Sequence, residues 1–233
     1  MVVGNVYGNI DLMNFYAQKY HCDAIMSTGN LGVYYPNETS YKTTTIYNGR
    51  TTDFGKYLMG KEEFKTKLFA IRGRFDSEKL CKTAEGREDF LDNLLILKNS
   101  STITFSAKDN DTVKFSGIGG RYSAYPYNNN SSNYEYFTKN DFEKLIQNTY
   151  DIVLLHDVIG GGSSKKIIFG QEIYEICKRS VPKFIFLGQY DYQAFCPGIY
   201  DTNFVVCPSI AKGFHILDTD GWNLYFIKQI YCN

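Results

Sequence analysis

Short apolar runs alternate with amphipathic stretches along most of the chain. The runs have the length of β-strands, and Ile152–Leu155 and Phe184–Leu187 are clear examples. Apolar residues also recur at intervals of three and four between Leu12 and Tyr20, which predicts a helix after the first run. Alternating strands and helices are typical of an α/β protein. Core strands are expected at Met1–Val6, Cys22–Thr28, Lys67–Arg72, Asp151–Leu155 and Lys183–Leu187.

Further elements follow from capping and turn signals. Thr138, with Asp141 three residues later, predicts a capping box at the start of a helix over Asp141–Asn148. Asp53–Leu58 and Phe169–Arg179 are also expected to be helical. Polar or glycine-rich loops are expected at Pro36–Gly49, Gly119–Tyr136 and Asp157–Ser164, and short strands at Asn93–Leu97, Thr102–Ser106, Thr112–Ile118, Phe204–Cys207, Gly213–Leu217 and Trp222–Gln229.

These elements predict a four-layer αββα sandwich of two mixed sheets with helices outside. No repeat of 20 to 50 residues and no shift in composition marks a boundary, so residues 1–233 are expected to form a single domain. The chain is 43% hydrophobic over 233 residues, which is enough to bury a full core.

Charge and composition argue against several function classes. Lys and Arg number 25 and Asp and Glu number 25, so the chain lacks the basic surplus that binding to nucleic acid usually requires. No apolar run approaches the ~20 residues of a membrane span, and the N-terminus does not resemble a secretory signal. We therefore expect a cytoplasmic or nuclear protein that is not secreted. The six cysteines are scattered without zinc-site spacing and are expected to be mostly buried apolar residues.

Turns bordered by glycine or histidine follow the predicted core strands. In sheets of this kind, ligands bind at the carboxyl ends of the strands, so these turns are the candidate site. In chain order they are Gly4-Asn5-Val6-Tyr7-Gly8-Asn9, Gly29-Asn30-Leu31-Gly32, Arg72-Gly73-Arg74-Phe75-Asp76, Leu155-His156-Asp157 and Leu187-Gly188-Gln189-Tyr190-Asp191.

The ordered turns resemble the blocks of the calcineurin-like metallophosphoesterase superfamily, which run GD-x-HG, GD, GNH[DE], H and GH-x-H. Val206-Cys207-Pro208-Ser209, followed by Gly213, is similar to the closing V-N-P-G-S segment of that family. The stretch Phe54–Lys61, ahead of Ile71-Arg72-Gly73, is also similar to the lariat-debranching enzymes and their splicing-factor relatives. The resemblance spans nearly the whole chain and implies the same αββα sandwich.

Most of the metal ligands that the resemblance implies are replaced in this sequence. The aspartate and histidine of the first block are Asn5 and Tyr7, and the bridging aspartate of the second block is Asn30. His156 matches the histidine of its block. In the third block the asparagine ligand is Arg74 and the histidine is Phe75, and in the last block the two histidines are Gln189 and Asp191.

The resemblance implies a pair of divalent cations, such as Mn, Mg or Zn, about 3.5–4 Å apart. Replacing aspartate by Asn5 and Asn30 removes two negative charges that would offset those cations. Arg74 would add a positive charge, and like charges at 4 Å cost about 4 kcal/mol at an effective dielectric constant of 20. We therefore expect no bound metal and no cofactor, with Arg74 in place of a cation and paired with Asp191 or Asp76.

Three functions remain open from the sequence. The first is a catalytically inactive pseudoenzyme that serves as a binding or structural scaffold. The second is a weak single-metal phosphoesterase that uses His156, Asp191 and Asn30 or Asn5. The third is a metal-free phosphate or nucleotide binder based on Arg74.

Two further features bear on binding partners. Segments rich in Tyr and Asn at Val33–Arg50 and Arg121–Tyr136 would suit an interaction surface for an unknown protein partner or for self-association. Gly160–Lys166 lacks the spacing of a phosphate-binding P-loop and is interpreted as a flexible loop.

Overall fold

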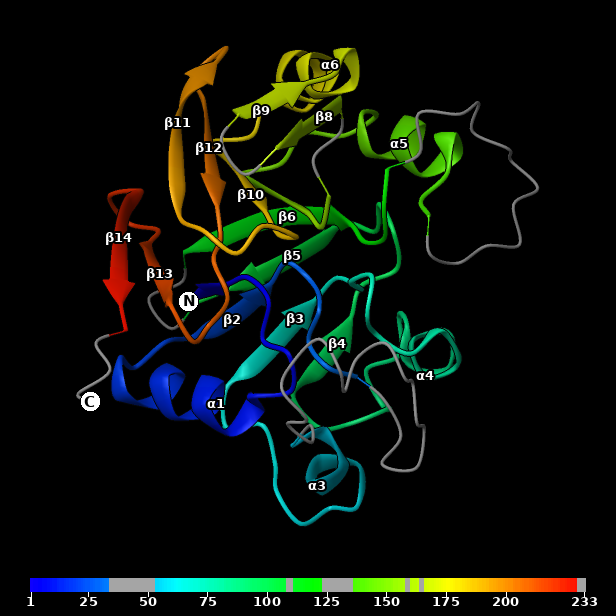
Figure 1. The fold of residues 1–233 in the computed structure, drawn as a ribbon, viewed down its shortest axis with the longest axis vertical. Helices are drawn as coiled ribbons and strands as arrows, with labels where there is room; N and C mark the ends of the chain where they lie inside the picture. Colours follow the sequence, from blue (N-terminus) through cyan, green and yellow to red (C-terminus); the bar gives the residue numbers. More distant parts are fainter. Residues whose placement is uncertain (34–52, 108–110, 123–135, 158–159, 164–165, 230–233) are drawn as a thin grey trace.

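The computed structural model describes residues 1–33, 53–107, 111–122, 136–157, 160–163 and 166–229 (Figure 1). Its strands form two six-stranded sheets and one separate hairpin. The expected loop at Pro36–Gly49 lies outside the described residues, as does most of the one at Gly119–Tyr136.

The first sheet has the strand order β14-β13-β1-β2-β3-β4. Its strands β1 to β4 run parallel to one another, whereas β13 is antiparallel to both β1 and β14. The strands are β1 (Val2–Val3), β2 (Ala24–Ser27), β3 (Lys67–Ala70), β4 (Leu94–Ile96), β13 (Gly213–Asp218) and β14 (Asn223–Lys228).

The second sheet has the strand order β11-β12-β10-β7-β6-β5. Four neighbouring strands are parallel, and the end strands β5 and β11 are antiparallel to their neighbours. The strands are β5 (Ile103–Ser106), β6 (Thr112–Ile118), β7 (Ile152–Leu155), β10 (Phe184–Leu187), β11 (Ala194–Ile199) and β12 (Thr202–Val206).

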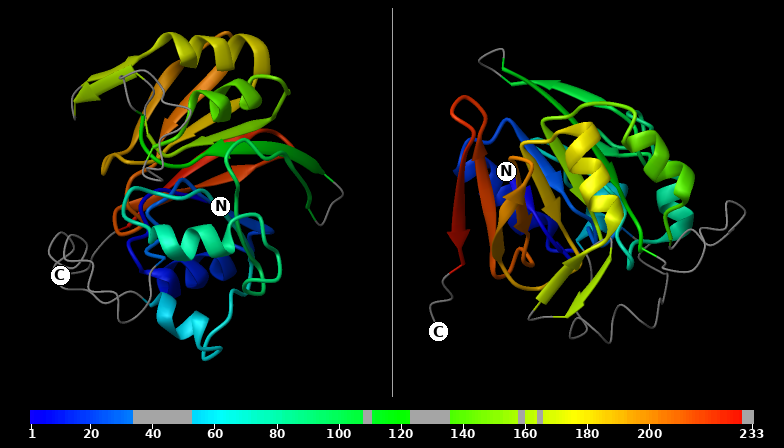
Figure 2. Two further views of the ribbon diagram at one scale, coloured as in Figure 1. Left: turned by 90° about the vertical axis from the view of Figure 1, so that its right-hand side faces the viewer. Right: turned by 90° about the horizontal axis from the view of Figure 1, so that it is seen from above.

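The two sheets face each other and helices cover both outer faces, so the predicted αββα sandwich is confirmed (Figure 2). Apolar side chains between the sheets include Phe69 and Phe186, which lie on strands of different sheets. Two further apolar clusters join each sheet to its own helices. The strands β7 and β10 are buried along their whole length, which explains their uninterrupted apolar sequences.

The helices begin and end close to the expected positions. The capping box of Thr138 and Asp141 is present, and it starts α5 two residues earlier than expected. A helix that the sequence analysis missed, α4, begins where the Ser77 side chain accepts a hydrogen bond from the Leu80 N–H. No helix in the described ranges is both long and apolar enough to cross a membrane. The helices are α1 (Ile10–Lys19), α3 (Phe54–Leu58), α4 (Glu78–Ala84), α5 (Lys139–Leu145) and α6 (Gln171–Ser180).

One expectation about a loop is wrong, and one strand was not expected. The glycine-rich segment that follows His156 forms a hairpin of β8 (Gly160–Ser163) and β9 (Lys166–Phe169) rather than a loop. A strand, β11, also occupies a segment for which no element was expected. The core strands themselves are shorter than expected: β1 and β3 each end before the turn that the apolar pattern included.

Candidate functional site

The carboxyl ends of β1, β2, β3, β7 and β10 meet at one edge of the sandwich, where glycines let the loops approach closely. A Cβ atom on Gly73 would lie 1.9 Å from the backbone nitrogen of Asn30. A Cβ on Gly29 would lie 2.6 Å from Nδ1 of His156, and one on Gly188 would lie 3.1 Å from the same atom. These distances are shorter than, or close to, the shortest contacts that a Cβ atom tolerates. Only glycine at these positions therefore allows the loops around His156 to come into direct contact.

Asn5 and Asn30 are joined in a chain of hydrogen bonds at the centre of this edge. The Phe75 N–H donates to Oδ1 of Asn30 over 3.0 Å, and Nδ2 of Asn30 donates to Oδ1 of Asn5 over 2.7 Å. Nδ2 of Asn5 then donates to the Tyr190 carbonyl over 3.3 Å. Both asparagine side chains are buried, and each one accepts and donates, so the chain is neutral and internally satisfied.

Three of the candidate positions hold a residue in the left-handed backbone region. Tyr7 has φ 52°, Asn30 has φ 52° and Gln189 has φ 50°. This conformation costs about 1–2 kcal/mol for a residue with a Cβ, and asparagine tolerates it best. The backbone N–H groups of Val6 and Tyr7 both donate to the Asn30 carbonyl, which holds the first two loops together. The tyrosine and glutamine therefore keep a strained loop geometry.

His156 is buried at the end of β7, and both of its ring nitrogens have hydrogen-bond partners. Nδ1 lies 2.8 Å from the Thr28 carbonyl, and Nε2 accepts the N–H of Arg74 over 3.1 Å. This pattern requires a proton on Nδ1 and none on Nε2, which is the neutral ring. Burial lowers the pKa of His156, against the opposing effect of its hydrogen bond to Thr28. The ring connects β7 to the loops after β2 and β3.

Asp76 organises the loops in a way that the sequence analysis did not foresee. Its carboxylate accepts backbone N–H groups from Gly73 over 2.7 Å and from Gly32 over 2.8 Å. It also accepts the N–H of Val33 over 3.1 Å and of Leu31 over 3.3 Å. One side chain thus holds the turn after β2 against the turn after β3. The signal in the sequence was an acidic residue three positions after the glycine of a turn.

The expectation that Arg74 points into the pocket and pairs with Asp191 or Asp76 is wrong. The Arg74 side chain is exposed, and its guanidinium carbon lies 5.2 Å from the centre of the Phe75 ring. Asp191 instead forms an ion pair with Lys212 at 2.7 Å and accepts the Ser209 N–H over 3.2 Å. Burial raises the pKa of Asp191, but these hydrogen bonds outweigh that effect and hold the pKa below its ordinary value.

Replacing Arg74 by alanine is therefore expected to have a small effect on stability. An exposed cation over an aromatic ring contributes about 0.5–1 kcal/mol and an exposed ion pair about 0–1 kcal/mol, so the free energy of unfolding should fall by no more than about 2 kcal/mol. Urea denaturation of Arg74→Ala beside the wild type measures the difference. A loss of several kcal/mol would instead indicate that the Arg74 side chain is buried and paired inside the site.

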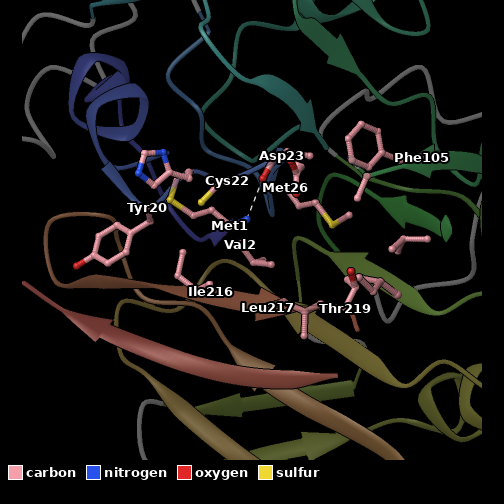
Figure 3. Close-up of a pocket in the computed structure, with 15 residues that line it drawn as sticks. Met1, Val2, Tyr20, Cys22, Asp23, Met26, Phe105, Ile216, Leu217 and Thr219 are labelled. Carbon is pink, nitrogen blue, oxygen red and sulfur yellow. Dashed lines mark hydrogen bonds between the residues drawn. The ribbon is translucent and has the colours of Figure 1, made fainter. Parts of the chain in front are cut away.

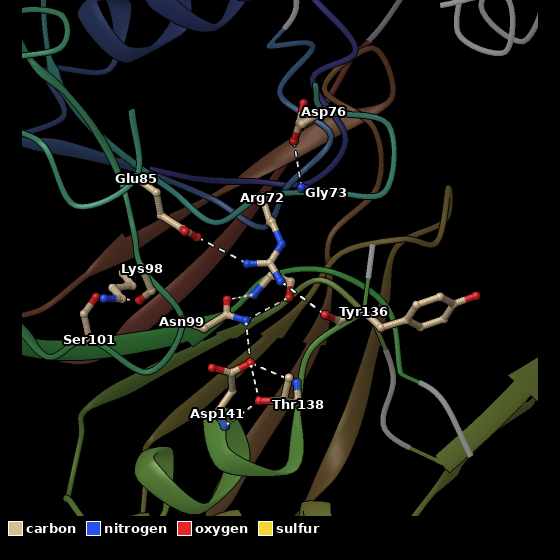
Figure 4. Close-up of polar contacts among 11 residues, drawn as sticks. Arg72, Gly73, Asp76, Glu85, Lys98, Asn99, Ser101, Tyr136, Thr138 and Asp141 are labelled. Carbon is tan, nitrogen blue, oxygen red and sulfur yellow. Dashed lines mark hydrogen bonds and ion pairs between the residues drawn. The ribbon is translucent and has the colours of Figure 1, made fainter. Parts of the chain in front are cut away.

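The buried arginine of this turn is Arg72, two residues earlier (Figure 4). Its guanidinium lies 3.2 Å from the Glu85 carboxylate and donates to the Tyr136 carbonyl over 3.4 Å. Glu85 follows α4 beside the first sheet, and Tyr136 precedes α5 beside the second sheet. Arg72 therefore joins the two halves of the sandwich, and its partners explain why a positive charge is tolerated there.

The residues at this edge do not fit a pair of divalent cations. The side chains of Asn5 and Asn30 are neutral and bonded to each other, and both nitrogens of His156 are in use. The one carboxylate among the eight candidate positions, Asp191, is neutralised by Lys212. Across the described part of the chain, no cluster of three His, Cys, Asp or Glu side chains is arranged to hold a metal ion.

A cavity of about 160 Å³ lies at the opposite edge of the sandwich (Figure 3). It is lined by residues at the amino ends of the parallel strands, among them Val2, Ala24 and Ile152. Ligands of open α/β sheets bind at the carboxyl ends, so this cavity is separate from the candidate site. Most of its lining residues are apolar, and its polar members are Tyr20, His21, Cys22, Asp23 and Thr219.

The chain shares its αββα sandwich of two mixed six-stranded sheets with solved structures. No protein-family model matches the chain, and no curated protein matches it in sequence. Solved structures do match, and one crystal structure aligns over 97% of both chains with a TM-score of 0.64 and 12% identity. TT1561 of Thermus thermophilus has a TM-score of 0.61 and 14% identity over 97% of this chain and 96% of its own. GAP50, the anchor in the inner membrane complex of Plasmodium, has a TM-score of 0.52 and 15% identity over 97% of this chain and 73% of its own.

Proposed function

We propose that this protein is a catalytically inactive metallophosphoesterase-like protein that serves as a binding or structural scaffold. The observation that carries the proposal is the hydrogen-bonded chain from the Phe75 N–H through Asn30 and Asn5 to the Tyr190 carbonyl. Each amide in that chain donates one hydrogen bond and accepts another, whereas a carboxylate can only accept. The positions that would bind cations therefore suit amides that bond to each other.

The single-metal alternative would break contacts that the protein already makes. To ligate a metal, His156 would have to give up its hydrogen bond to either the Thr28 carbonyl or the Arg74 N–H. Because the His156 ring is buried, the released group would lose its partner in a buried position. Leaving a buried polar group unpaired costs about 1–3 kcal/mol. Asp191 would also have to give up its ion pair with Lys212.

The phosphate-binding alternative meets the same difficulty. Backbone N–H groups in the turns after β2 and β3 are the natural donors for an anion, and four of them already donate to the Asp76 carboxylate. A phosphate would have to compete with a carboxylate that is part of the chain. We therefore favour the scaffold over both alternatives.

An anchoring role has a counterpart among proteins of this fold. GAP50, which shares the fold at a TM-score of 0.52, is the anchor in the inner membrane complex of Plasmodium. That similarity supports a structural role for this fold without identifying a partner for this chain.

Metal analysis of the purified protein, together with a phosphoesterase assay, tests the proposal. We expect well below one Mn, Mg or Zn ion per chain, because the Asp191 carboxylate is paired with Lys212 and the Asp76 carboxylate already accepts four backbone N–H groups. Hydrolysis of aryl phosphate monoesters and diesters should stay at background when each metal is supplied. Two tightly held metals per chain, or turnover that is lost in His156→Ala, would contradict the proposal.

A further inference from the structure

The strand β14 ends the first sheet and pairs on one side only among the described residues (Figure 1). Its pairing with β13 runs without a shift in register from Asn223 to Lys228. Directly after it, the Gln229 N–H donates to the Lys212 carbonyl, and backbone groups alternate in direction along a strand. The N–H and C=O groups of Leu224 and Phe226 therefore point away from β13, toward the outside of the sheet.

The other end strands carry features that discourage pairing, whereas β14 carries only one such feature, Lys228 at its end. β4 has only three residues, all of them buried. β11 has an irregular register and contains Pro197, which lacks an N–H, and β5 has only four residues. β14 has six residues, and from Asn223 to Ile227 it contains no proline and no charged residue. Natural proteins usually protect such an edge, so an unprotected one indicates a binding surface.

Exposed aromatic rings lie beside this edge on the helix-covered face of the sheet. Tyr225 of β14 is 53% exposed, and on α1 Phe15 is 57% and Tyr20 is 37% exposed. The Tyr20 ring lies 5.6 Å from the ring of Phe214, which pairs with Ile227 of β14. Phe15, Tyr20 and Tyr225 are called the aromatic flank below.

We propose that β14 pairs with β14 of a second copy of this chain, antiparallel and around a two-fold axis at Tyr225. The outward groups of Leu224 then pair with those of Phe226 in the other copy, and the two Tyr225 residues lie opposite each other. The edge is uncharged from Asn223 to Ile227 and the whole chain has a formal charge of zero, so two copies meet without repulsion. This inference is independent of the function proposed above.

The size of the surface sets the expected strength of the dimer. An aromatic side chain buries about 150–250 Å², so the exposed parts of the aromatic flank supply roughly 300 Å² on each copy. With one six-residue strand, the total stays below the ~800 Å² per partner of a standard stable interface. The dimer should therefore be reversible and depend on concentration.

Sedimentation velocity over a range of concentrations tests this dimer. The wild type should shift from one chain to two as concentration rises, and Tyr225→Glu should raise the dissociation constant about tenfold or more, because like charges would face each other. Tyr200→Glu is the matched control, since Tyr200 is 61% exposed at the turn between β11 and β12. A wild type that stays monomeric at every concentration overturns the proposal. In that case the edge of β14 would be available only for pairing with a strand of another protein.

A cross-link tests the position of the two-fold axis. Residues opposite each other in a non-hydrogen-bonded antiparallel pair have Cα atoms about 4.5 Å apart, within the range of a disulfide. Tyr225→Cys should form a reducible dimer under mild oxidation, whereas Tyr200→Cys, with the same native cysteines, should not. Equal dimer yields from both variants and the wild type would refute this arrangement even if the chain self-associates.

Discussion

Replacing His156 by alanine is expected to lower the free energy of unfolding by roughly 3–5 kcal/mol. The ring is fully buried and satisfies the Thr28 carbonyl and the Arg74 N–H, which belong to two different loops. Alanine would leave both groups unpaired and a cavity between the glycines that surround the ring. Urea denaturation at neutral pH measures the loss.

His156→Asn separates the hydrogen bonds from the volume of the ring. An asparagine amide can still donate to the Thr28 carbonyl, so this variant should lose clearly less stability than His156→Ala. A loss of less than about 1 kcal/mol in the alanine variant would mean that the loops do not depend on His156. The same result would remove the argument that both ring nitrogens are already in use.

The core strands could be predicted because burial on both faces leaves a plain signal. β7 and β10 are continuous apolar runs, and their expected and observed bounds differ by one residue at the start. The capping box of α5 was predictable for a similar reason, since Thr138 and Asp141 act locally. These elements depend on interactions that the sequence shows directly.

Two of the three missed elements, β8 and β11, lack such a signal. β8 consists of three glycines and a serine, so no side-chain pattern distinguishes it from a loop. β11 contains a proline and a glycine, which normally argue against a strand, and it is placed by pairing with β12. The helix α4 does have a local signal, the cap of Ser77, but with seven residues it is too short for a clear apolar periodicity.

At the candidate site, the sequence indicated which residues meet but not how their side chains point. Asn5, Asn30 and His156 do lie at one edge, linked through the turn after β3. The Arg74 side chain points outward because its N–H is held by His156 and the preceding Gly73 is packed against Asn30. Those backbone contacts come from loops far apart in the sequence, and no local pattern reports them.

Introducing two carboxylates, in the double variant Asn5→Asp with Asn30→Asp, should make stability fall as pH rises. With both acids protonated, each one can donate and accept, so the hydrogen-bonded chain to the Tyr190 carbonyl is kept. Both positions are buried, and burial together with a neighbouring carboxylate raises a carboxyl pKa by up to 3–5 units. The folded state then holds protons that the unfolded state releases above about pH 4, so stability is lost from there upward.

The expected loss is about 4–6 kcal/mol by pH 8 for each carboxyl that burial keeps protonated, at about 1.4 kcal/mol for each pH unit between about pH 4 and pH 8. The wild type should behave in the opposite way, because burial lowers the pKa of His215 to about 4 and stability is then lost as pH falls from about 6.5 to 4. Urea midpoints at pH 4.5 and pH 8 give both slopes, with the exposed substitution Asn148→Asp as the control that keeps the wild-type slope. If the double variant is equally stable at both pH values, water reaches the site and two carboxylates cost little there. In that case the absence of negative charge at Asn5 and Asn30 would not explain why this edge of the sandwich is unsuited to a cation pair.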